Sequence, residues 1–132
     1  MRVLDRIFRA VNELSVGLLR LRRQEDDLLV RTEALATLAE AGIEAKATPH
    51  SPWGLRIDGK PALNKLALFT GGGVEVQDEG SQLLALITDP KRGEMVVDFC
   101  AGAGGKTLAI GASMRNTGRL YAFDTSGHRL EA

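Results

Sequence analysis

A glycine-rich stretch late in the chain has the residue types needed to bind an anionic or polar ligand. It reads FCAGAGGKT over residues 99–107, follows the apolar run MVVDF and precedes a second apolar run that reaches Met114. A strand, a glycine turn and a helix in this order place backbone N–H groups at a helix N-terminus, which attracts such ligands. We therefore expect a binding loop here, and a strand RLYAFD at residues 119–124 that completes a β-α-β unit.

Three kinds of glycine loop compete for this stretch. A phosphate-binding P-loop has the pattern G-x-x-x-x-G-K-[ST], but Cys100 occupies the position of its first glycine. A dinucleotide-binding loop has the pattern G-x-G-x-x-G, for which Gly102 and Gly104 supply two glycines while Thr107 replaces the third. The first loop of a methyltransferase that binds S-adenosylmethionine follows a strand ending in an acid, here Asp98, and contains small residues.

An acid after the second strand would accept the ribose hydroxyls of the cofactor in either of the last two kinds of site. Asp124 ends RLYAFD and lies 20 residues after Gly104, about the separation at which a β-α-β unit returns its second strand. A carboxylate can accept hydrogen bonds from both hydroxyls of a ribose. The loop and this acid together do not distinguish S-adenosylmethionine from NAD.

The first 31 residues carry a helical pattern. Apolar residues recur at steps of three and four over residues 3–23, which predicts an amphipathic helix with an interruption near residues 15–17. We expect the polar segment RQEDD that follows to form a turn and LLVR to form a short strand.

The next segments predict a small α/β module. TEALATLAEAGIEA has the pattern of a helix with Thr32 as its N-cap and Gly42 as its end. Short strands are expected at residues 43–47 and 55–57, between prolines and glycines. TGGG at residues 70–73 is expected to be a flexible link, and we place a domain boundary there.

The segment between that link and the glycine loop predicts one strand, one helix and a second strand. VEVQ has the pattern of a strand, and Asp78 is expected to cap a helix that runs through Ile87 and ends before Pro90. The continuous apolar run MVVDF is typical of a strand buried in a parallel sheet.

Composition and charge exclude several classes of protein. Lys and Arg number 17, as do Asp and Glu, so no overall positive charge attracts nucleic acid, and any RNA contact needs a local patch. We find no apolar run of the length that a membrane span requires and no secretory signal. Cys100 is the single cysteine, which excludes an internal disulfide and a multi-cysteine metal site. We expect a cytoplasmic protein without a metal, in which Cys100 is a small buried residue.

Longer motifs in the second half resemble one family, the RNA 5-methylcytosine methyltransferases, which includes bacterial 16S rRNA enzymes. The family patterns are QD-x-[AG]-S-Q, LD-x-C-A-[AG]-[PA]-G-G-K-T, and a strand ending in Asp before RL. The chain has QDEGSQ at residues 77–82, VDFCAGAGGKT at 97–107, and FD with a later RL at 123–130. Ala103 stands where many members have proline. The resemblance covers residues 73–132 and continues through EAGIEAKATPHSPWGLRIDG, which looks like the family's small RNA-binding domain; it gives no role to residues 1–32.

The resemblance implies S-adenosyl-L-methionine as the cofactor and assigns its binding residues. The main chain of the loop would surround the methionine end of the cofactor and Asp124 would hold its ribose; the loop residues are Cys100, Ala101, Gly102, Ala103, Gly104, Gly105 and Lys106. The family attacks cytosine C6 with a cysteine thiolate and uses a second cysteine for product release, both in later motifs. Cys100 is not that nucleophile, so we expect no catalytic residue in this chain and no activity of the chain alone.

The expected fold is therefore α/β: a small N-terminal α/β module at residues 1–72, followed at residues 73–132 by the truncated opening β-α-β of a Rossmann-like class I methyltransferase domain. By the resemblance, the module would include an RNA-binding region from about residue 33. The expected partner of the full-length parent is 16S rRNA, with no membrane contact. Two alternatives remain: a non-catalytic RNA-binding or assembly fragment, and a fragment of a nicotinamide-dependent oxidoreductase. Exposed apolar strand edges in such a start of a sheet also predict self-association.

Overall fold

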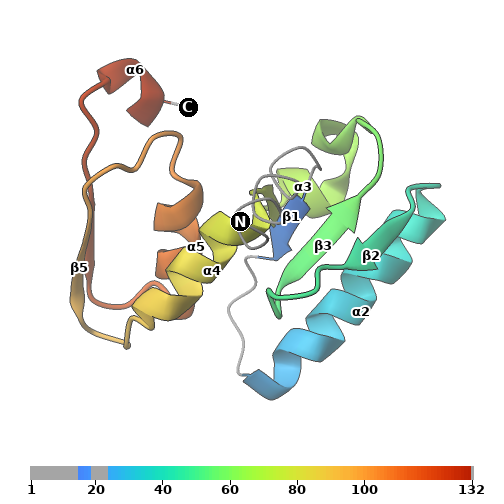
Figure 1. Cartoon of the computed structure of the whole chain (residues 1–132), viewed down its shortest axis with the longest axis horizontal. Coiled ribbons are helices and arrows are strands. Elements are labelled where there is room, and N and C mark those ends of the chain that lie inside the picture. The colour runs from blue at the N-terminus through green and yellow to red at the C-terminus, as the bar shows by residue number, and fades with distance from the viewer. Residues whose placement is uncertain (1–14, 19–23, 132) are drawn as a thin grey trace, which may run out of the picture.

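The chain folds into two sheets with a helix between them. The structure, a computed structural model, describes residues 15–18 and 24–131, and it is mixed α/β as expected. Helix α4 (Glu79–Thr88) lies between a sheet formed by the first half of the chain and a sheet formed by the second half (Figure 1). It contacts strand β1 of the first sheet and helix α5 beside the second.

The first sheet is antiparallel. Within the described residues it has four strands in the order β2-β3-β1-β4, namely β2 (Ala45–Ala47), β3 (Gly54–Ile57), β1 (Ser15–Leu18) and β4 (Val74–Val76). The central strand β1 pairs with β3 on one side and with β4 on the other. The expected strands at residues 43–47, 55–57 and in VEVQ are confirmed, with small differences at their ends.

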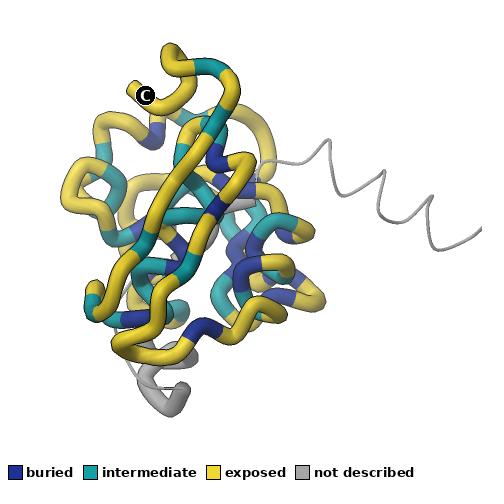
Figure 2. Tube along the Cα trace, turned by 90° about the vertical axis from the view of Figure 1, so that its left-hand side faces the viewer, coloured by how far each residue is buried: buried dark blue, intermediate teal, exposed yellow. Residues whose placement is uncertain are grey.

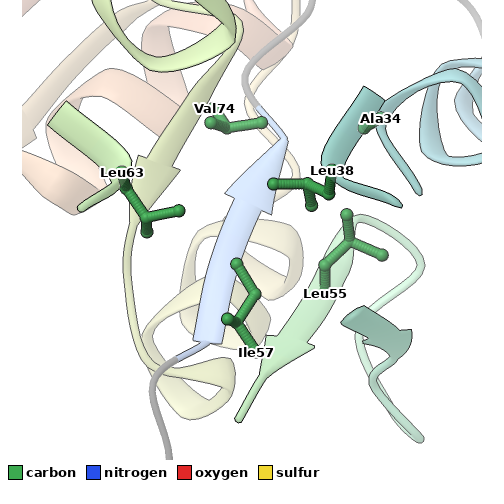
Figure 3. Packing of buried hydrophobic residues seen from close by; sticks show 6 residues of the cluster. All are labelled: Ala34, Leu38, Leu55, Ile57, Leu63 and Val74. Atoms are coloured by element: carbon green, nitrogen blue, oxygen red, sulfur yellow. The ribbon is translucent and has the colours of Figure 1, made fainter. Parts of the chain in front are cut away.

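One face of this sheet is covered and forms a closed core. Helix α2 (Gln24–Glu40) packs on β2 and β3. A 3-10 turn, η1 (Leu63–Lys65), and the short helix α3 (Ala67–Thr70) pack against the same core. Leu55 is 0% exposed and Leu38 is 1% exposed. Figure 3 shows the side chains of this core close together: Ala34, Leu38, Leu55, Ile57, Leu63 and Val74.

Two predictions for the residues before residue 32 are wrong. Residues 15–18 form strand β1, whereas a helix with an interruption was expected over residues 3–23; the rest of that expected helix lies outside the described residues. RQEDD and LLVR are not a turn and a strand, because α2 includes nearly all of both. Acidic residues stabilise the first turn of a helix, so a segment such as RQEDD can begin a helix as well as form a turn. No Gly or Pro interrupts residues 24–40. Thr32 is therefore inside the helix and does not cap it.

The end of α2 follows the expectation for Gly42. This glycine has φ +73°, which a residue without a side chain adopts at little cost. Its N–H donates to the Ala39 carbonyl, and the N–H of Ile43 donates to the Leu38 carbonyl, both at 2.9 Å. These two bonds define a Schellman motif, which redirects the chain into β2.

The expected boundary at residues 72 and 73 lies directly before β4. The glycines at residues 71–73 connect α3 to this strand, and β4 then pairs with β1 of the first sheet. The helix after it, α4, is capped as expected: Asp78 accepts a hydrogen bond from the Ser81 N–H at 2.9 Å. The boundary itself stays a prediction. Strand β4 lies after it and pairs with β1, which lies before it.

The second sheet is the expected β-α-β unit. Strands β5 (Met95–Asp98) and β6 (Arg119–Ala122) pair in parallel, and helix α5 (Gly105–Ser113) connects them. A short helix, α6 (Gly127–Leu130), follows β6. The sheet has these two strands within the described residues.

Only one face of this second sheet is covered. Val96 and Leu120 face each other across the register and pack against the cluster formed by α4 and α5, whose buried members are Ala85, Ala109, Ile110 and Met114. The neighbouring side chains point the other way: Met95 is 68% exposed and Val97 is 52% exposed. The expectation of a strand buried on both faces is therefore wrong for MVVDF. Exposed residues lie along both β5 and β6 (Figure 2). No helix in the described part of the chain is long and apolar enough to span a bilayer.

Candidate functional site

Asp98, at the end of β5, organises the start of the glycine loop. It is buried, 8% exposed, and its Oδ2 accepts a hydrogen bond from the Thr107 hydroxyl at 2.7 Å. Its Oδ1 accepts one from the N–H of Cys100 at 3.3 Å. The carboxylate thus joins both ends of the loop, and the threonine that replaces the third glycine of a dinucleotide-binding loop supplies one of these two bonds.

Two glycines give the loop its shape. Gly102 and Gly104 have φ of +56° and +89°, a region in which residues with a β-carbon are strained. Nothing in the described part of the chain lies within 4 Å of the β-carbon positions of either glycine. The requirement for glycine is therefore conformational, and the surface above both positions is open.

Asp124 closes the loop from the end of the second strand. Its Oδ2 accepts a hydrogen bond from the N–H of Gly102, and its Oδ1 accepts one from the N–H of Ser126, both at 2.9 Å. These N–H groups, first that of Ser126 and then that of Gly102, hold the pKa of the Asp124 carboxyl below its usual range. Asp124 is therefore a carboxylate at neutral pH, and each of its oxygens retains a lone pair for a further donor.

The strand pairing continues into the loop. The N–H of Phe123 donates to the Asp98 carbonyl at 2.8 Å, and the N–H of Ala101 donates to the Phe123 carbonyl at 2.9 Å. These bonds extend the parallel pairing of β5 and β6 by two residues, so the loop and Asp124 form at the same edge of the sheet. That edge, at the carboxyl ends of the strands, is where ligands bind in open α/β sheets.

The structure brings the residues expected from the sequence to this one edge. Cys100, Ala101, Gly102, Ala103 and Gly104 lie in the turn, Gly105 and Lys106 open α5, and Asp124 lies opposite Gly102. Cys100 is exposed, so the expectation that it is a small buried residue is wrong. Its backbone is fixed by Asp98, while its side chain lies outside the covered face.

Sequence reasoning missed three contributors to the site. The first two are Thr107, whose hydroxyl donates to Asp98, and Ser126, whose N–H donates to Asp124. Neither role could be predicted before the geometry of the loop was known. The third is Gln77, whose amide lies against the first residue of α5: a β-carbon at Gly105 would be 3.5 Å from its Nε2. QDEGSQ and the glycine loop are separate motifs in the sequence, and nothing in either one indicates this contact.

The arrangement suits a polar ligand. The first N–H groups of a helix have no acceptor within the helix, so α5 directs donors toward the open surface over the loop. Asp124 supplies acceptor oxygens at the same edge of the sheet, on the other side of the loop. A ligand with an anionic group at one end and hydroxyl donors at the other matches these donors and acceptors.

Comparisons with known proteins show which family the sequence resembles. Residues 85–132 match the family model described as 16S rRNA methyltransferase RsmB/F. A probable ribosomal RNA small subunit methyltransferase B from Synechocystis is 39% identical over 102 residues, which cover 76% of this chain and 23% of that protein. A 28S rRNA (cytosine-C(5))-methyltransferase from Mus musculus is 39% identical over 70 residues, or 53% of this chain and 15% of that protein.

A solved structure shares the fold over nearly the whole chain. The methyltransferase homolog protein from Pyrococcus horikoshii superimposes with a TM-score of 0.75 at 28% identity, over 96% of this chain and 41% of that one. The chain spans less than a quarter of the length of the curated relatives described above. On these matches, the chain belongs by sequence to the 16S rRNA methyltransferase RsmB/F family.

Proposed function

We propose that this chain forms the cofactor-binding start of an S-adenosylmethionine-dependent RNA (cytosine-C5)-methyltransferase that acts on ribosomal RNA. The observation that carries the proposal is the loop after β5, held by Asp98 at its base and by Asp124 at its tip. The family match and the two relatives named as rRNA methyltransferases support the reaction class, and the mouse relative's name supports the carbon that is methylated.

In this proposal the second half of the chain is the opening β-α-β of a Rossmann-like class I methyltransferase domain. The main chain from Cys100 to Lys106 surrounds the methionine end of the cofactor, and the donors at the start of α5 face its carboxylate. The oxygens of Asp124 accept the ribose hydroxyls. When bound, the cofactor supplies an electrophilic methyl group.

The chain's own residues bind and orient the donor, and the rest of the reaction needs other residues. C5 of a pyrimidine becomes nucleophilic only after a nucleophile such as a thiolate adds at C6. The sequence has one cysteine, Cys100, and it lies in the loop. We therefore propose that these 132 residues bind the donor and do not transfer its methyl group. The first sheet, in a cytoplasmic protein, would then take part in contacts with 16S rRNA.

A calorimetric titration with S-adenosylmethionine tests the proposal, with NADH and ATP as competing ligands. Selective binding of S-adenosylmethionine is expected. Asp124→Asn removes the charge and is expected to weaken binding about tenfold or more, because hydrogen bonds to a charged acceptor are stronger than those to a neutral one. The matched control is Asp58→Asn, at an exposed aspartate of the first half. Preference for NADH would instead favour a nicotinamide-dependent enzyme.

A non-catalytic RNA-binding role is the second candidate, and the closed core of the first sheet favours it. That core is complete within the described residues, with Leu55 and Ile57 at most 1% exposed. RNA binding by a chain that binds none of the three small ligands would support this second candidate over the first.

A further inference from the structure

Three polar side chains are buried in the short segment between the two sheets. They belong to QDEGSQ at residues 77–82, which ends β4 and begins α4: Gln77 is 8% exposed, Glu79 is 6% exposed and Gln82 is 1% exposed. Burying a polar side chain is unfavourable unless its surroundings replace the lost water. The contacts of these three side chains therefore indicate what the segment does.

Glu79 fixes a loop of the first sheet. Its Oε1 accepts hydrogen bonds from the N–H groups of His50 at 2.7 Å and Ser51 at 2.8 Å. Burial raises the pKa of the Glu79 carboxyl, but the bonds from Ser51 and His50 outweigh this effect and hold the pKa below its usual range. A charged oxygen at the start of α4 thus holds the backbone that connects β2 to β3.

Gln82 lies against the same loop, one helical turn further along α4. Its Nε2 donates to the Gln77 carbonyl at 3.0 Å. Its Oε1 faces the start of β3, where a β-carbon at Gly54 would lie 2.8 Å away and would also overlap the Thr48 hydroxyl. The glycine at the start of β3 therefore permits a close approach of α4 to the loop at residues 48–54.

Gln77 lies beside the second half of the chain. Its Nε2 and Cγ would lie 3.5 Å and 3.8 Å from a β-carbon at Gly105, the first residue of α5. Gly105 directly follows Gly104, whose left-handed conformation ends the glycine loop. One six-residue segment thus binds the β2–β3 loop and lies beside the start of the candidate ligand-binding helix.

We propose that residues 77–82 couple these two regions mechanically, with Gln77 and Glu79 as the positioning residues of the segment. Glu79 holds the loop at residues 48–54, Gln77 supports Gly105, and the rigid start of α4 transmits a displacement of either one to the other. The two sheets consequently unfold as one cooperative unit. The coupling rests on the contacts above, and only its effect on methyl-donor binding rests on the proposed function.

The sequence provides a separate spectroscopic probe for each half. Trp53 is the single tryptophan and packs against the first core, while Tyr121 is the single tyrosine and lies in β6. In urea, Trp53 fluorescence and the ring-proton nuclear magnetic resonance signals of Tyr121 are expected to change in one coincident transition in the wild-type chain. Glu79→Ala is expected to separate the two transitions, whereas Glu79→Gln keeps them together because its amide oxygen accepts the same two N–H groups.

Glu40→Ala, at an exposed glutamate at the end of α2, is the matched control and is expected to keep one transition. Separate transitions in the wild type, or coincident transitions in Glu79→Ala, would overturn the proposal. Gln77→Ala removes the contact at the other end of the segment and carries the same expectation if Glu79→Ala does not fold.

Amide hydrogen exchange distinguishes coupling from a local effect. In Glu79→Ala, exchange at His50 and Ser51 is expected to rise about tenfold or more, because two donors lose a charged acceptor. Coupling predicts that the amide of Leu108, which donates to the Gly104 carbonyl at 2.8 Å and which Glu79 does not touch, also exchanges faster, and that Glu79→Gln restores both sets. Faster exchange confined to the loop at residues 48–54 would contradict the proposal.

Binding of S-adenosylmethionine supplies a functional readout. Glu79→Ala is expected to weaken it about fivefold or more, a usual size for coupling between two sites, while Glu79→Gln stays near the wild type. If the wild-type chain binds no S-adenosylmethionine, the proposed function fails, and the unfolding transitions still decide whether the coupling exists.

Discussion

The two sheets of this chain use similar residues but differ in how completely they are covered. The first sheet has α2, η1 and α3 over one face and buries Leu38, Leu55 and Ile57 to 1% exposure or less. The second sheet is covered by α4 and α5 on one face and leaves the other to solvent, where Phe99 is 79% exposed and Val97 is 52% exposed. Stability is therefore expected to come mainly from the first sheet, and the candidate ligand site lies on the second.

The largest expected effect contrasts one buried and one exposed apolar residue. Leu55→Ala leaves a cavity in the first core and is expected to lower the free energy of unfolding by about 2–5 kcal/mol. Val97→Ala, on the uncovered face of β5, is expected to change it by less than about 0.5 kcal/mol. Urea unfolding followed by Trp53 fluorescence measures both, at a protein concentration low enough for the chain to be monomeric. Equal losses would mean that the exposed face is buried in solution.

A pair of glycines tests how the second sheet is held together. Gly118 has φ +90°, and a β-carbon there would overlap the Glu94 carbonyl oxygen and lie 2.8 Å from the carbonyl carbon of Gly93. Gly59 has φ +81° with nothing in the described structure within 4 Å. Both alanine substitutions therefore carry the left-handed strain of about 1–2 kcal/mol, and Gly118→Ala adds an overlap penalty of about 1–3 kcal/mol.

The hydrogen bond from the Arg119 N–H to the Glu94 carbonyl explains the difference. It joins the start of β6 to the residue before β5, and a methyl group at Gly118 would push the two apart. Thermal unfolding of the two variants under identical conditions measures the gap. A larger loss for Gly59→Ala than for Gly118→Ala would contradict this packing.

The same contrast explains which elements the sequence predicted. Between residues 74 and 122, the elements have local signals: the Asp78 cap, the apolar run before Asp98, and the glycines with positive φ at residues 102 and 104. Before residue 32 the signals are ambiguous, because the three-to-four spacing around residues 15–18 does not reveal that two distant strands pair with them. Tertiary pairing overrides local periodicity there.

The candidate site was predicted only as far as local chemistry reaches. The loop and Asp124 are found from spacing, because a β-α-β unit returns its second strand to the same edge. The contact of Gln77 with Gly105 and the bonds from Glu79 to His50 and Ser51 join residues 28 or more positions apart, and no local pattern encodes them. The burial of three polar side chains in QDEGSQ becomes meaningful only in the folded chain.

The uncovered face predicts self-association of moderate strength. Phe99 and Phe123 lie in contact there, with ring centroids 6.3 Å apart, and burying an exposed phenylalanine stabilises a complex by about 1.5–3 kcal/mol. Size-exclusion chromatography with light scattering is expected to give a molar mass above the 14.2 kDa of one chain. Phe99→Asp is expected to weaken the association about tenfold or more. A compact wild-type monomer at high concentration would count against this.

The smallest expected effect compares the two carboxylates that accept backbone N–H groups, one in each region. Both have a pKa below its usual range in the folded chain. Each therefore stabilises the fold above the carboxyl pKa of the unfolded chain, and this contribution is lost as the pH falls through the lower, folded pKa. The amide resonances of Gly102 and Ser126 report Asp124, and those of His50 and Ser51 report Glu79.

Salt is expected to separate the two responses. The pKa of Asp124 is lowered first by the N–H groups of Ser126 and Gly102 and to a smaller extent by Arg129. Because Asp124 lies at the open edge of the second sheet, added salt is expected to screen the contribution of Arg129. Glu79 is 6% exposed, and its titration is held by two hydrogen bonds that salt screens much less. Asp124→Asn is expected to remove the pH response at Gly102 while leaving the response at His50. If salt moved the titrations of both regions by the same amount, the burial of Glu79 would not distinguish it from Asp124. The contrast between a closed first region and an open second region would then fail at these two residues.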